Sequence, residues 1–230
     1  ASGHQPGGRR GAAAPPVLGP DAGAPARRPS REPARRAAIV PSVFMSAPTS
    51  AARGDAGERI AGLVRDLVRD VPDYPAPGVM FKDISGLLHD GPAFRACVDQ
   101  LAQRAADDGA ALIAGIEARG FLVAAAIARA LGVGVVPIRK AGKLPPPTRR
   151  LSYELEYGSA EIELPMVELA GKRVYLADDV LATGGTAQAA LALLRSAGAQ
   201  IGGIGMLLDL EFLGGRARLA EYDVCSLLRV

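Results

Sequence analysis

The sequence predicts an α/β fold in which a central, mostly parallel β-sheet is flanked by helices. Short apolar runs alternate with longer stretches whose apolar residues recur every three to four positions, as expected when strands and helices alternate. The short runs are apolar at successive positions, which is typical of strands that helices cover on both faces. A long Gly- and Pro-rich segment at 139–165 interrupts this alternation and predicts a flexible loop with a hairpin.

The expected elements can be placed in order along the chain. Apolar residues at helical spacing predict a helix over 58–71, which Pro72 ends, and a second helix near 92–107. The alternation of strands and helices then begins. Its expected strands are 111–116, 133–138, 173–179, 201–210 and 224–230, and its expected helices are 120–131 and 186–197.

The interrupting segment reads RKAGKLPPPTRRLSYELEYGSAEIELP. Apolar and acidic residues alternate over 153–157, which predicts a strand, and the Gly-Ser-Ala at 158–160 is expected to turn the chain into a second strand. A long loop inside a compact domain is commonly a lid or a binding element. We therefore expect a hairpin that projects from the sheet behind a flexible, basic loop.

The amino-terminal segment differs in composition from the rest of the chain. Residues 1–50 are dominated by Ala, Pro, Gly and Arg, and we expect a disordered extension before a domain over 51–230. Seven arginines against two acidic residues give 1–44 a net charge of +5, which leaves −2 of the chain's +3 for the remainder. The basic pI therefore predicts no nucleic-acid partner. Met45 resembles a natural start, so an inert extension is favoured over targeting or interaction.

Cysteine, histidine and apolar content limit the function classes further. The chain has two cysteines, neither in a CxxC arrangement, and two histidines, so neither a disulfide framework nor a His-rich metal site is expected. No apolar run approaches the length of a bilayer span. We expect a cytoplasmic protein without a membrane partner.

The stretch LADDVLATGGTAQAA at 176–190 places two carboxylates beside a glycine-rich turn that leads into a helix. Backbone N–H groups in such a turn, with the helix N-terminus, form an anion site. Asp178 and Asp179 would repel an anion, unless the ligand also brings hydroxyls and a hydrated Mg²⁺. A sugar phosphate that carries a pyrophosphate has all of these groups. A simple tight turn with helix-capping or solvated carboxylates is the alternative.

Other chemistry-bearing residues are expected at the same place. Ligands of an open parallel sheet bind at the carboxyl ends of its strands. That edge collects residues 117–120, the pair Arg139 and Lys140, and the carboxylates Asp178 and Asp179. The sequence thus predicts one site that holds both cations and anions.

Five separated motifs resemble those of a known family, the type I phosphoribosyltransferases, and most closely its adenine-using members. The motifs are DYPAPGVMFKDISGLL, GIEARGF, IRKAGKLP, SYELEYGSAEIEL and DDVLATGGTA, in the family's order and spacing over roughly residues 55–230. The resemblance implies the type I phosphoribosyltransferase fold with a hood hairpin. It implies purine salvage by transfer of a 5-phosphoribosyl group from phosphoribosyl pyrophosphate (PRPP) to adenine, giving AMP and pyrophosphate.

The resemblance also implies roles for individual residues. The 5′-phosphate would be held by Ala182, Thr183, Gly184, Gly185 and Thr186, and the ribose hydroxyls by Asp178 and Asp179. Pyrophosphate would meet Arg119, Arg139, Lys140 and Lys143, partly from the partner subunit of a homodimer. Adenine would meet Met80, Phe81 and Lys82, while Glu156 and Tyr157 lie on the hood hairpin. Mg²⁺ would be held through PRPP and water near the Asp pair, and the peptide bond between Glu117 and Ala118 is expected to be cis.

The choice of base and of the acid–base group depends on Ala182. Relatives that use 6-oxopurines commonly carry an acidic residue at that position of the phosphate loop, so alanine favours adenine. Glu156 and Arg119 are then the candidate catalytic residues. Glu156 is expected to act as the acid–base group for the adenine proton as N9 attacks. Its alternative role is to form the polar face of an exposed hairpin. The competing functions are a phosphoribosyltransferase for another purine base and a PRPP-sensing regulator that binds nucleic acid.

Overall fold

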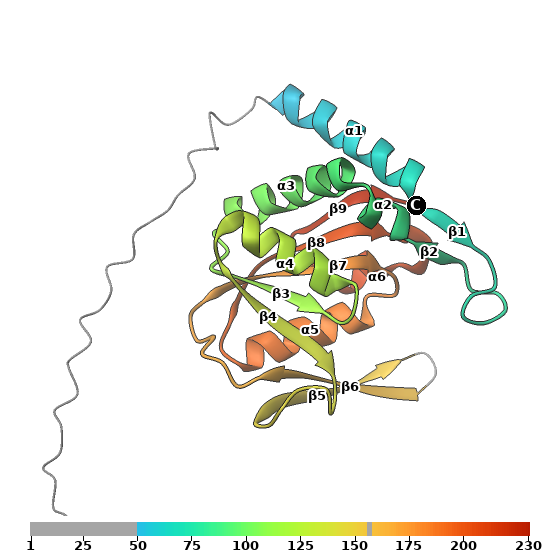
Figure 1. Ribbon diagram of the computed structural model, residues 1–230. Helices are drawn as coiled ribbons and strands as arrows, with labels where there is room; N and C mark the ends of the chain where they lie inside the picture. The colour runs from blue at the N-terminus through green and yellow to red at the C-terminus, as the bar shows by residue number, and fades with distance from the viewer. Residues whose placement is uncertain (1–49, 156–157) are drawn as a thin grey trace, which may run out of the picture. The chain divides into compact units, whose positions relative to one another are not determined.

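The computed structural model of the chain describes residues 50–155 and 158–230. It contains a seven-stranded sheet in the order β5-β6-β4-β3-β7-β8-β9. The neighbours from β4 to β9 are parallel, whereas β5 and β6 are antiparallel strands added at one edge (Figure 1). Its strands are β3 (Leu112–Ile116), β4 (Gly134–Lys140), β5 (Thr148–Leu155), β6 (Gly158–Pro165), β7 (Arg173–Leu181), β8 (Gln200–Asp209) and β9 (Val224–Arg229). The predicted α/β class is confirmed.

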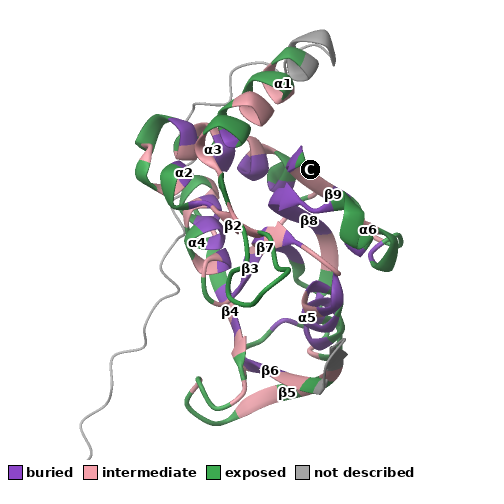
Figure 2. Cartoon of the chain, turned by 90° about the vertical axis from the view of Figure 1, so that its right-hand side faces the viewer, coloured by how far each residue is buried: buried purple, intermediate pink, exposed green. Residues whose placement is uncertain are grey.

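Helices cover both faces of this sheet. Helices α1 (Ser50–Leu67), α2 (Ser85–His89), α3 (Gly91–Asp107) and α4 (Gly120–Leu131) contribute to one apolar core, and α5 (Gly185–Ser196) contributes to the other. Strand β7 shows the division, because Tyr175 and Leu176 point to opposite cores. Buried residues accordingly run along the central strands in Figure 2. After β8 the chain forms a 3-10 turn, η1 (Glu211–Leu213), and the short helix α6 (Gly215–Arg218).

Local sequence explains where two of these helices begin or end. The Asp90 carboxylate accepts a hydrogen bond from the Ala93 N–H at 2.9 Å and so caps α3. Gly132 ends α4 with φ +69°, a backbone conformation that favours glycine. None of the helices in the described part of the chain is long and apolar enough to cross a membrane.

The first predicted helix was wrong at its carboxyl end. Helix α1 ends at Leu67, and β1 (Arg69–Val71) pairs antiparallel with β2 (Phe81–Asp83). Cross-strand ion pairs accompany this pairing, with Lys82 Nζ 2.7 Å from Asp70 Oδ1 and Arg69 Nη2 3.0 Å from Asp83 Oδ2. The apolar spacing continues through Val71, so periodicity alone could not separate the helix from the strand.

The predicted hairpin exists, but its turn and its surroundings differ from the prediction. Gly158, Ser159 and Ala160 lie within β6 rather than in a turn, since Leu155 pairs with Gly158. The hairpin also extends the main sheet, because Arg139 and Lys140 of β4 pair with β6. Only 141–147 remain as a loop between β4 and β5. Residues 1–49, for which disorder was predicted, and 156–157 lie outside the described residues.

Candidate active site

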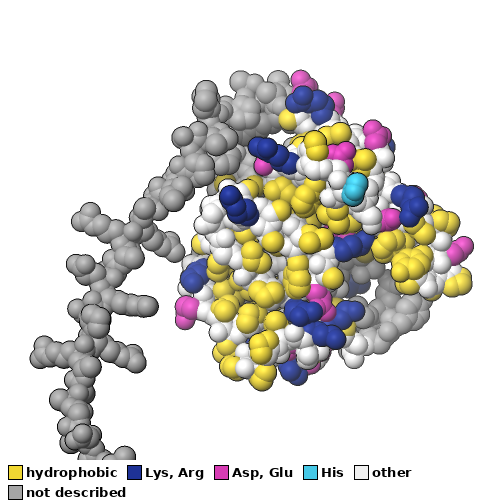
Figure 3. Space-filling view, in the orientation of Figure 1, with side chains coloured by type: hydrophobic (Ala, Val, Ile, Leu, Met, Phe, Trp, Pro, Cys, Tyr) yellow, Lys and Arg dark blue, Asp and Glu magenta, His cyan; other side chains and the backbone are white. Residues whose placement is uncertain are grey.

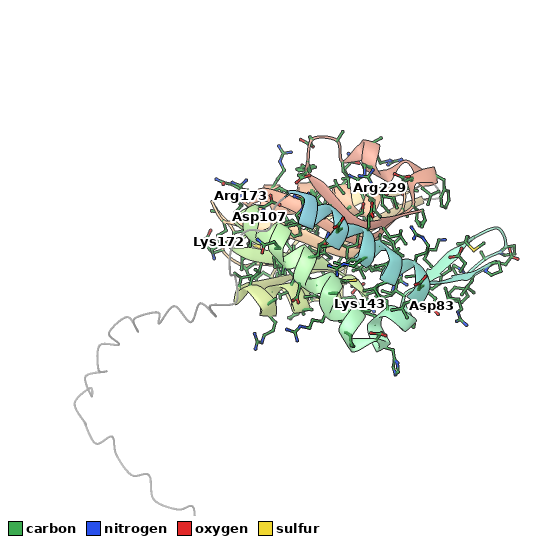
Figure 4. The ribbon with its side chains drawn as sticks, turned by 90° about the horizontal axis from the view of Figure 1, so that it is seen from above. Asp83, Asp107, Lys143, Lys172, Arg173 and Arg229 are labelled. Atoms are coloured by element: carbon green, nitrogen blue, oxygen red, sulfur yellow. The ribbon has the colours of Figure 1, made fainter. Side chains whose placement is uncertain are left out.

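The candidate site is a cavity of about 340 Å³ at the carboxyl ends of β3 and β7. It is formed by two segments far apart in the sequence, 116–119 and 178–187. Arg173, the first residue of β7, lies on the opposite side of the domain from Asp83 in Figure 4. The cavity lining contains Ile116 and Leu181, the last residues of β3 and β7, so the cavity lies at the edge predicted from the strand order.

The two carboxylates of β7 have different surroundings. Asp179 is 6% exposed, and its Oδ2 forms an ion pair with Arg119 Nη2 at 2.6 Å. Burial and the negative charge of Asp179 raise the pKa of Asp178 well above its usual range. Gly120 follows Arg119, and a Cβ at that position would overlap Asp178. Glycine at 120 thus permits the close approach of α4 to the carboxylate pair.

The phosphate loop, residues 182–186, joins β7 to α5. Gly184 is the residue before α5 and has φ +80°, and its Cβ would lie 2.6 Å from Gly215 O. Within the described chain no side chain caps α5, so the first N–H groups of the helix are available to a ligand. Thr186 Oγ1 lies 3.2 Å from the Tyr153 hydroxyl on β5, which connects the loop to the hairpin. This geometry is that of an anion site.

The residues expected at the base lie beside Arg119 rather than on the wall of the cavity. The Arg119 guanidinium carbon is 4.9 Å from the centroid of the Phe81 ring, within the range of a cation–π contact. Arg119 also donates from Nη1 to Lys82 O at 3.2 Å. The Lys82 ammonium is paired with Asp70, and Met80 is 43% exposed. Arg119 therefore bridges β2, which holds Phe81, and the carboxylate pair.

Of the cations expected at pyrophosphate, Arg119 lines the cavity, whereas Arg139, Lys140 and Lys143 lie outside its lining. Arg139 donates from Nε to Glu117 Oε2 at 2.6 Å and from Nη1 to Lys143 O at 2.9 Å. Burial acts to raise the pKa of Glu117, but hydrogen bonds and charge from Arg139 and Lys140 lower it overall. Lys140 and Lys143 are exposed. Glu117 thus holds Arg139 at the base of the 141–147 loop, and its bond to Ala118 is cis as predicted.

A buried carboxylate that sequence reasoning missed organises that loop. Glu163 of β6 is fully buried and accepts hydrogen bonds from Lys143 N, Leu144 N and Thr148 Oγ1 at 2.8–3.0 Å, and from Arg150 Nε at 3.1 Å. Burial alone would raise the pKa of Glu163, but these bonds lower it below its usual value. The available signal was an acidic residue between two apolar ones, Ile162 and Leu164, in an expected strand.

Not every predicted site residue can be placed. Arg119, Asp178, Asp179 and residues 182–186 line one cavity. Glu156 and Tyr157 lie outside the described residues, and their roles stay predictions. No group of three or more His, Cys, Asp and Glu side chains in the described ranges is arranged to hold a metal ion. The site is therefore built from an anion loop, a carboxylate pair and one bridging guanidinium.

Comparison with known proteins was consistent with this site. Residues 86–217 match the phosphoribosyl transferase domain. The chain is 54% identical over 183 residues to the adenine phosphoribosyltransferase of Salinispora tropica, covering 79% of this chain and 97% of that protein. The corresponding values for the Streptomyces coelicolor enzyme are 55% over 161 residues, 70% and 88%.

Solved structures gave the same result. The adenine phosphoribosyltransferase of Thermoanaerobacter pseudethanolicus is 43% identical with a TM-score of 0.71, covering 74% of this chain and 99% of that one. The Saccharomyces cerevisiae enzyme, complexed with an imino-altritol bisphosphate and adenine, is 34% identical with a TM-score of 0.70 and the same coverage.

Proposed function

The chain belongs to the phosphoribosyltransferase family, and we infer that it transfers the 5-phosphoribosyl group of PRPP to adenine, giving AMP and pyrophosphate in purine salvage. The relatives described above are adenine phosphoribosyltransferases, and this chain matches 97% of the Salinispora tropica protein and 99% of the Thermoanaerobacter pseudethanolicus chain. The observation that carries the inference is the presence of the carboxylate pair and the anion loop in one cavity. Such a cavity suits a ligand that has hydroxyls and a phosphate.

The sugar phosphate occupies two adjacent half-sites. Residues 182–186 receive the 5′-phosphate on backbone N–H groups and on the hydroxyls of Thr183 and Thr186. Asp178 and Asp179 accept hydrogen bonds from the ribose hydroxyls. Since burial and mutual repulsion raise the pKa of Asp178, hydroxyl donors on the ligand favour the ionised pair. The two half-sites fix C1′ relative to the base.

Arg119 is the catalytic cation of the proposal. Its guanidinium lies within the cavity, between the Asp179 carboxylate and the Phe81 ring. Charge-assisted bonds from a guanidinium to phosphate oxygens are strong and directional. We assign Arg119 to the leaving pyrophosphate. Pyrophosphate and the Asp179 carboxylate compete for the N–H donors of this guanidinium. Arg139 and Lys140 add charge from the end of β4, and Lys143 adds charge from the loop that Glu163 holds.

The base stacks on Phe81, and Met80 and Lys82 contribute backbone contacts to its edge. Adenine N9 attacks C1′ with inversion while pyrophosphate departs, and Glu156 accepts the proton that adenine loses. Tyr157 closes the site beside it. The protein contributes position, charge neutralisation and exclusion of water. A base that stacks on Phe81 must share the surface of that ring with the Arg119 guanidinium.

Mg²⁺ is proposed to accompany PRPP. The described residues offer two neighbouring carboxylates but no three-ligand cluster, which suits an ion bound mainly through pyrophosphate oxygens and water. When bound, it neutralises charge on the leaving group. Asp178 and Asp179 would face its hydration shell.

A cytoplasmic homodimer is the proposed form of the enzyme. Leu122 on α4 and Val135 on β4 are 52% and 42% exposed, and hydrophobic side chains gather over these elements in Figure 3. Both cysteines are free, as expected in a reducing compartment. An active monomer in analytical sedimentation would contradict the homodimer.

A panel of bases tests the proposed function. Purified protein is incubated with PRPP, Mg²⁺ and adenine, hypoxanthine, guanine or xanthine, and pyrophosphate release is measured. We expect pyrophosphate release with adenine. We also expect the Thr183→Ala variant to need more PRPP than the wild type to reach the same rate. Release with a 6-oxopurine but not with adenine would overturn the assignment of the base.

A further inference from the structure

Helix α6 forms a second wall of the phosphate loop. A Cβ on Gly184 would lie 2.6 Å from Gly215 O and 3.1 Å from Gly215 Cα. These distances are shorter than ordinary contacts between non-bonded atoms. Gly215 itself is buried, and a Cβ there would overlap Ala182 O. The loop and the first residue of α6 therefore touch backbone to backbone, with no side chain between them.

Arg216 fixes α6 to β8 and β9. Its Nε donates to Asp209 Oδ2 at 2.9 Å, its Nη1 to Val224 O at 2.8 Å and its Nη2 to Ser226 Oγ at 2.7 Å. The Asp209 side chain is fully buried, so this pair lies largely out of solvent. A helix of four residues is not stable by itself. The three bonds of Arg216, together with the backbone contact of Gly215, therefore fix the position of α6.

Arg218, at the end of α6, presents its guanidinium to the phosphate loop. A methyl group on Gly185, the first residue of α5, would lie 3.9 Å from Arg218 Nη1 and 3.9 Å from Thr183 Oγ1. Arg218 Nη1 and Thr183 Oγ1 therefore both lie close to Gly185, although Arg218 is not part of the cavity lining. Arg218 is exposed and makes no hydrogen bond or ion pair with the residues of 50–155 and 158–230.

The side chains that line the cavity carry more negative than positive charge, which disfavours binding of an anion. Its lining includes three carboxylates, Glu117, Asp178 and Asp179, but Arg119 is the only cationic side chain in that lining. Arg119 is already paired with Asp179. A phosphate dianion at the loop would otherwise be held only by backbone dipoles, each of which contributes a fraction of a charge, and by the neutral hydroxyls of Thr183 and Thr186. A guanidinium beside the loop compensates for this deficit.

We propose that Arg218 binds the 5′-phosphate directly and that Gly215, Arg216 and Asp209 position it. The inference rests on the proposed function for the identity of the anion. Arg218 then adds one charge to a site that otherwise relies on N–H groups and hydroxyls. Arg216 is a positioning residue, because its guanidinium is fully engaged with Asp209, Val224 and Ser226.

Ligands with and without the phosphate test this proposal by isothermal titration calorimetry. The variants are Arg218→Ala, Arg218→Lys and the control Arg65→Ala, an exposed arginine on α1. We expect Arg218→Ala to weaken AMP and ribose 5-phosphate by about tenfold, in the range of a partly solvated charged hydrogen bond. Adenosine, which lacks the phosphate, should lose less than about twofold. Arg218→Lys should recover part of the loss, and Arg65→Ala should bind AMP like the wild type.

Two outcomes would overturn the proposal. One is wild-type affinity of Arg218→Ala for AMP and ribose 5-phosphate. The other is an equal loss for AMP and adenosine, which would indicate a structural effect. A wild-type protein that binds AMP but does not convert adenine and PRPP would refute the proposed reaction without refuting the role of Arg218. Normal wild-type turnover with unchanged AMP affinity in Arg218→Ala would refute only the role of Arg218.

Discussion

Gly184 lies where the phosphate loop, α5 and α6 meet, and its replacement by alanine tests how far this packing determines PRPP binding. The added Cβ would lie 2.6 Å from Gly215 O, whereas carbon–oxygen contacts normally begin at about 3.3 Å. The loop or α6 must then move by roughly 0.7 Å. Because the neighbouring atoms are backbone, no side-chain rotation can relieve the overlap.

The expected effect has two parts. A positive φ costs a residue with a Cβ about 1–2 kcal/mol, which should lower the free energy of unfolding of Gly184→Ala by at least that amount. Displacement of a binding group by about 1 Å can reduce catalysis by about 100-fold. For the smaller displacement at this loop we expect kcat/KM for PRPP to fall by roughly 30-fold, or about 2 kcal/mol.

Gly132→Ala is the matched control. Gly132 also has a positive φ, +69°, but none of the described atoms lies within 4 Å of the Cβ it would gain. Both variants should lose the stability that a positive φ costs, Gly184→Ala should lose more in urea unfolding because of its overlap with Gly215, and only Gly184→Ala should lose kcat/KM for PRPP in initial-rate assays. The reasoning is refuted if the two variants have kcat/KM values within threefold of each other.

Three further predictions concern carboxylates and a thiol. Glu156→Ala should lower kcat by about 10²–10⁴ if Glu156 is an acid–base group, measured beside Glu161→Ala; near wild-type kcat would make it a hairpin residue only. Because the folded state lowers the pKa of Glu163 from 4.5, its contribution to stability is present above about pH 4.5 and lost as the pH falls through the folded value. Urea midpoints of Glu163→Gln should therefore fall less on acidification than those of the wild type, and parallel pH profiles would contradict this. Burial raises the pKa of Cys97 to about 11, so alkylation at pH 8, followed by mass spectrometry, should modify Cys97 more slowly than the half-buried Cys225; equal rates would be inconsistent with this.

The fold class and the anion loop could be predicted because their signals are local. Apolar runs identify β3, β7 and β8 from a few residues each. The glycines at 184 and 185 lie directly between an expected strand and an expected helix, so the sequence places them at a strand end. The carboxylates Asp178 and Asp179 precede them on the same strand. Such contiguous patterns need no knowledge of the tertiary structure.

The supporting residues could not be predicted because their partners are distant in sequence. Glu163 resembles an ordinary polar residue of a strand until β6 pairs with β4 and buries it against residues 143–150. The role of Gly215 depends on a backbone contact with Gly184, 31 positions earlier. Likewise, the end of α1 depends on the pairing of β1 with β2. Tertiary contacts decide these features against the local pattern.

The hydrogen bond between Tyr153 and Thr186 couples the hairpin to the loop proposed to bind the 5′-phosphate. Either hydroxyl can be the donor across the 3.2 Å between them. A hydroxyl has one proton, so when Thr186 donates to a phosphate oxygen, Tyr153 must become the donor in this bond. Arrival of the phosphate would then fix the orientation of the Tyr153 proton and restrain β5, the strand that leads into Glu156. The strand directly before Glu156, the residue proposed for acid–base chemistry, would then be restrained by the sugar phosphate before the base reacts.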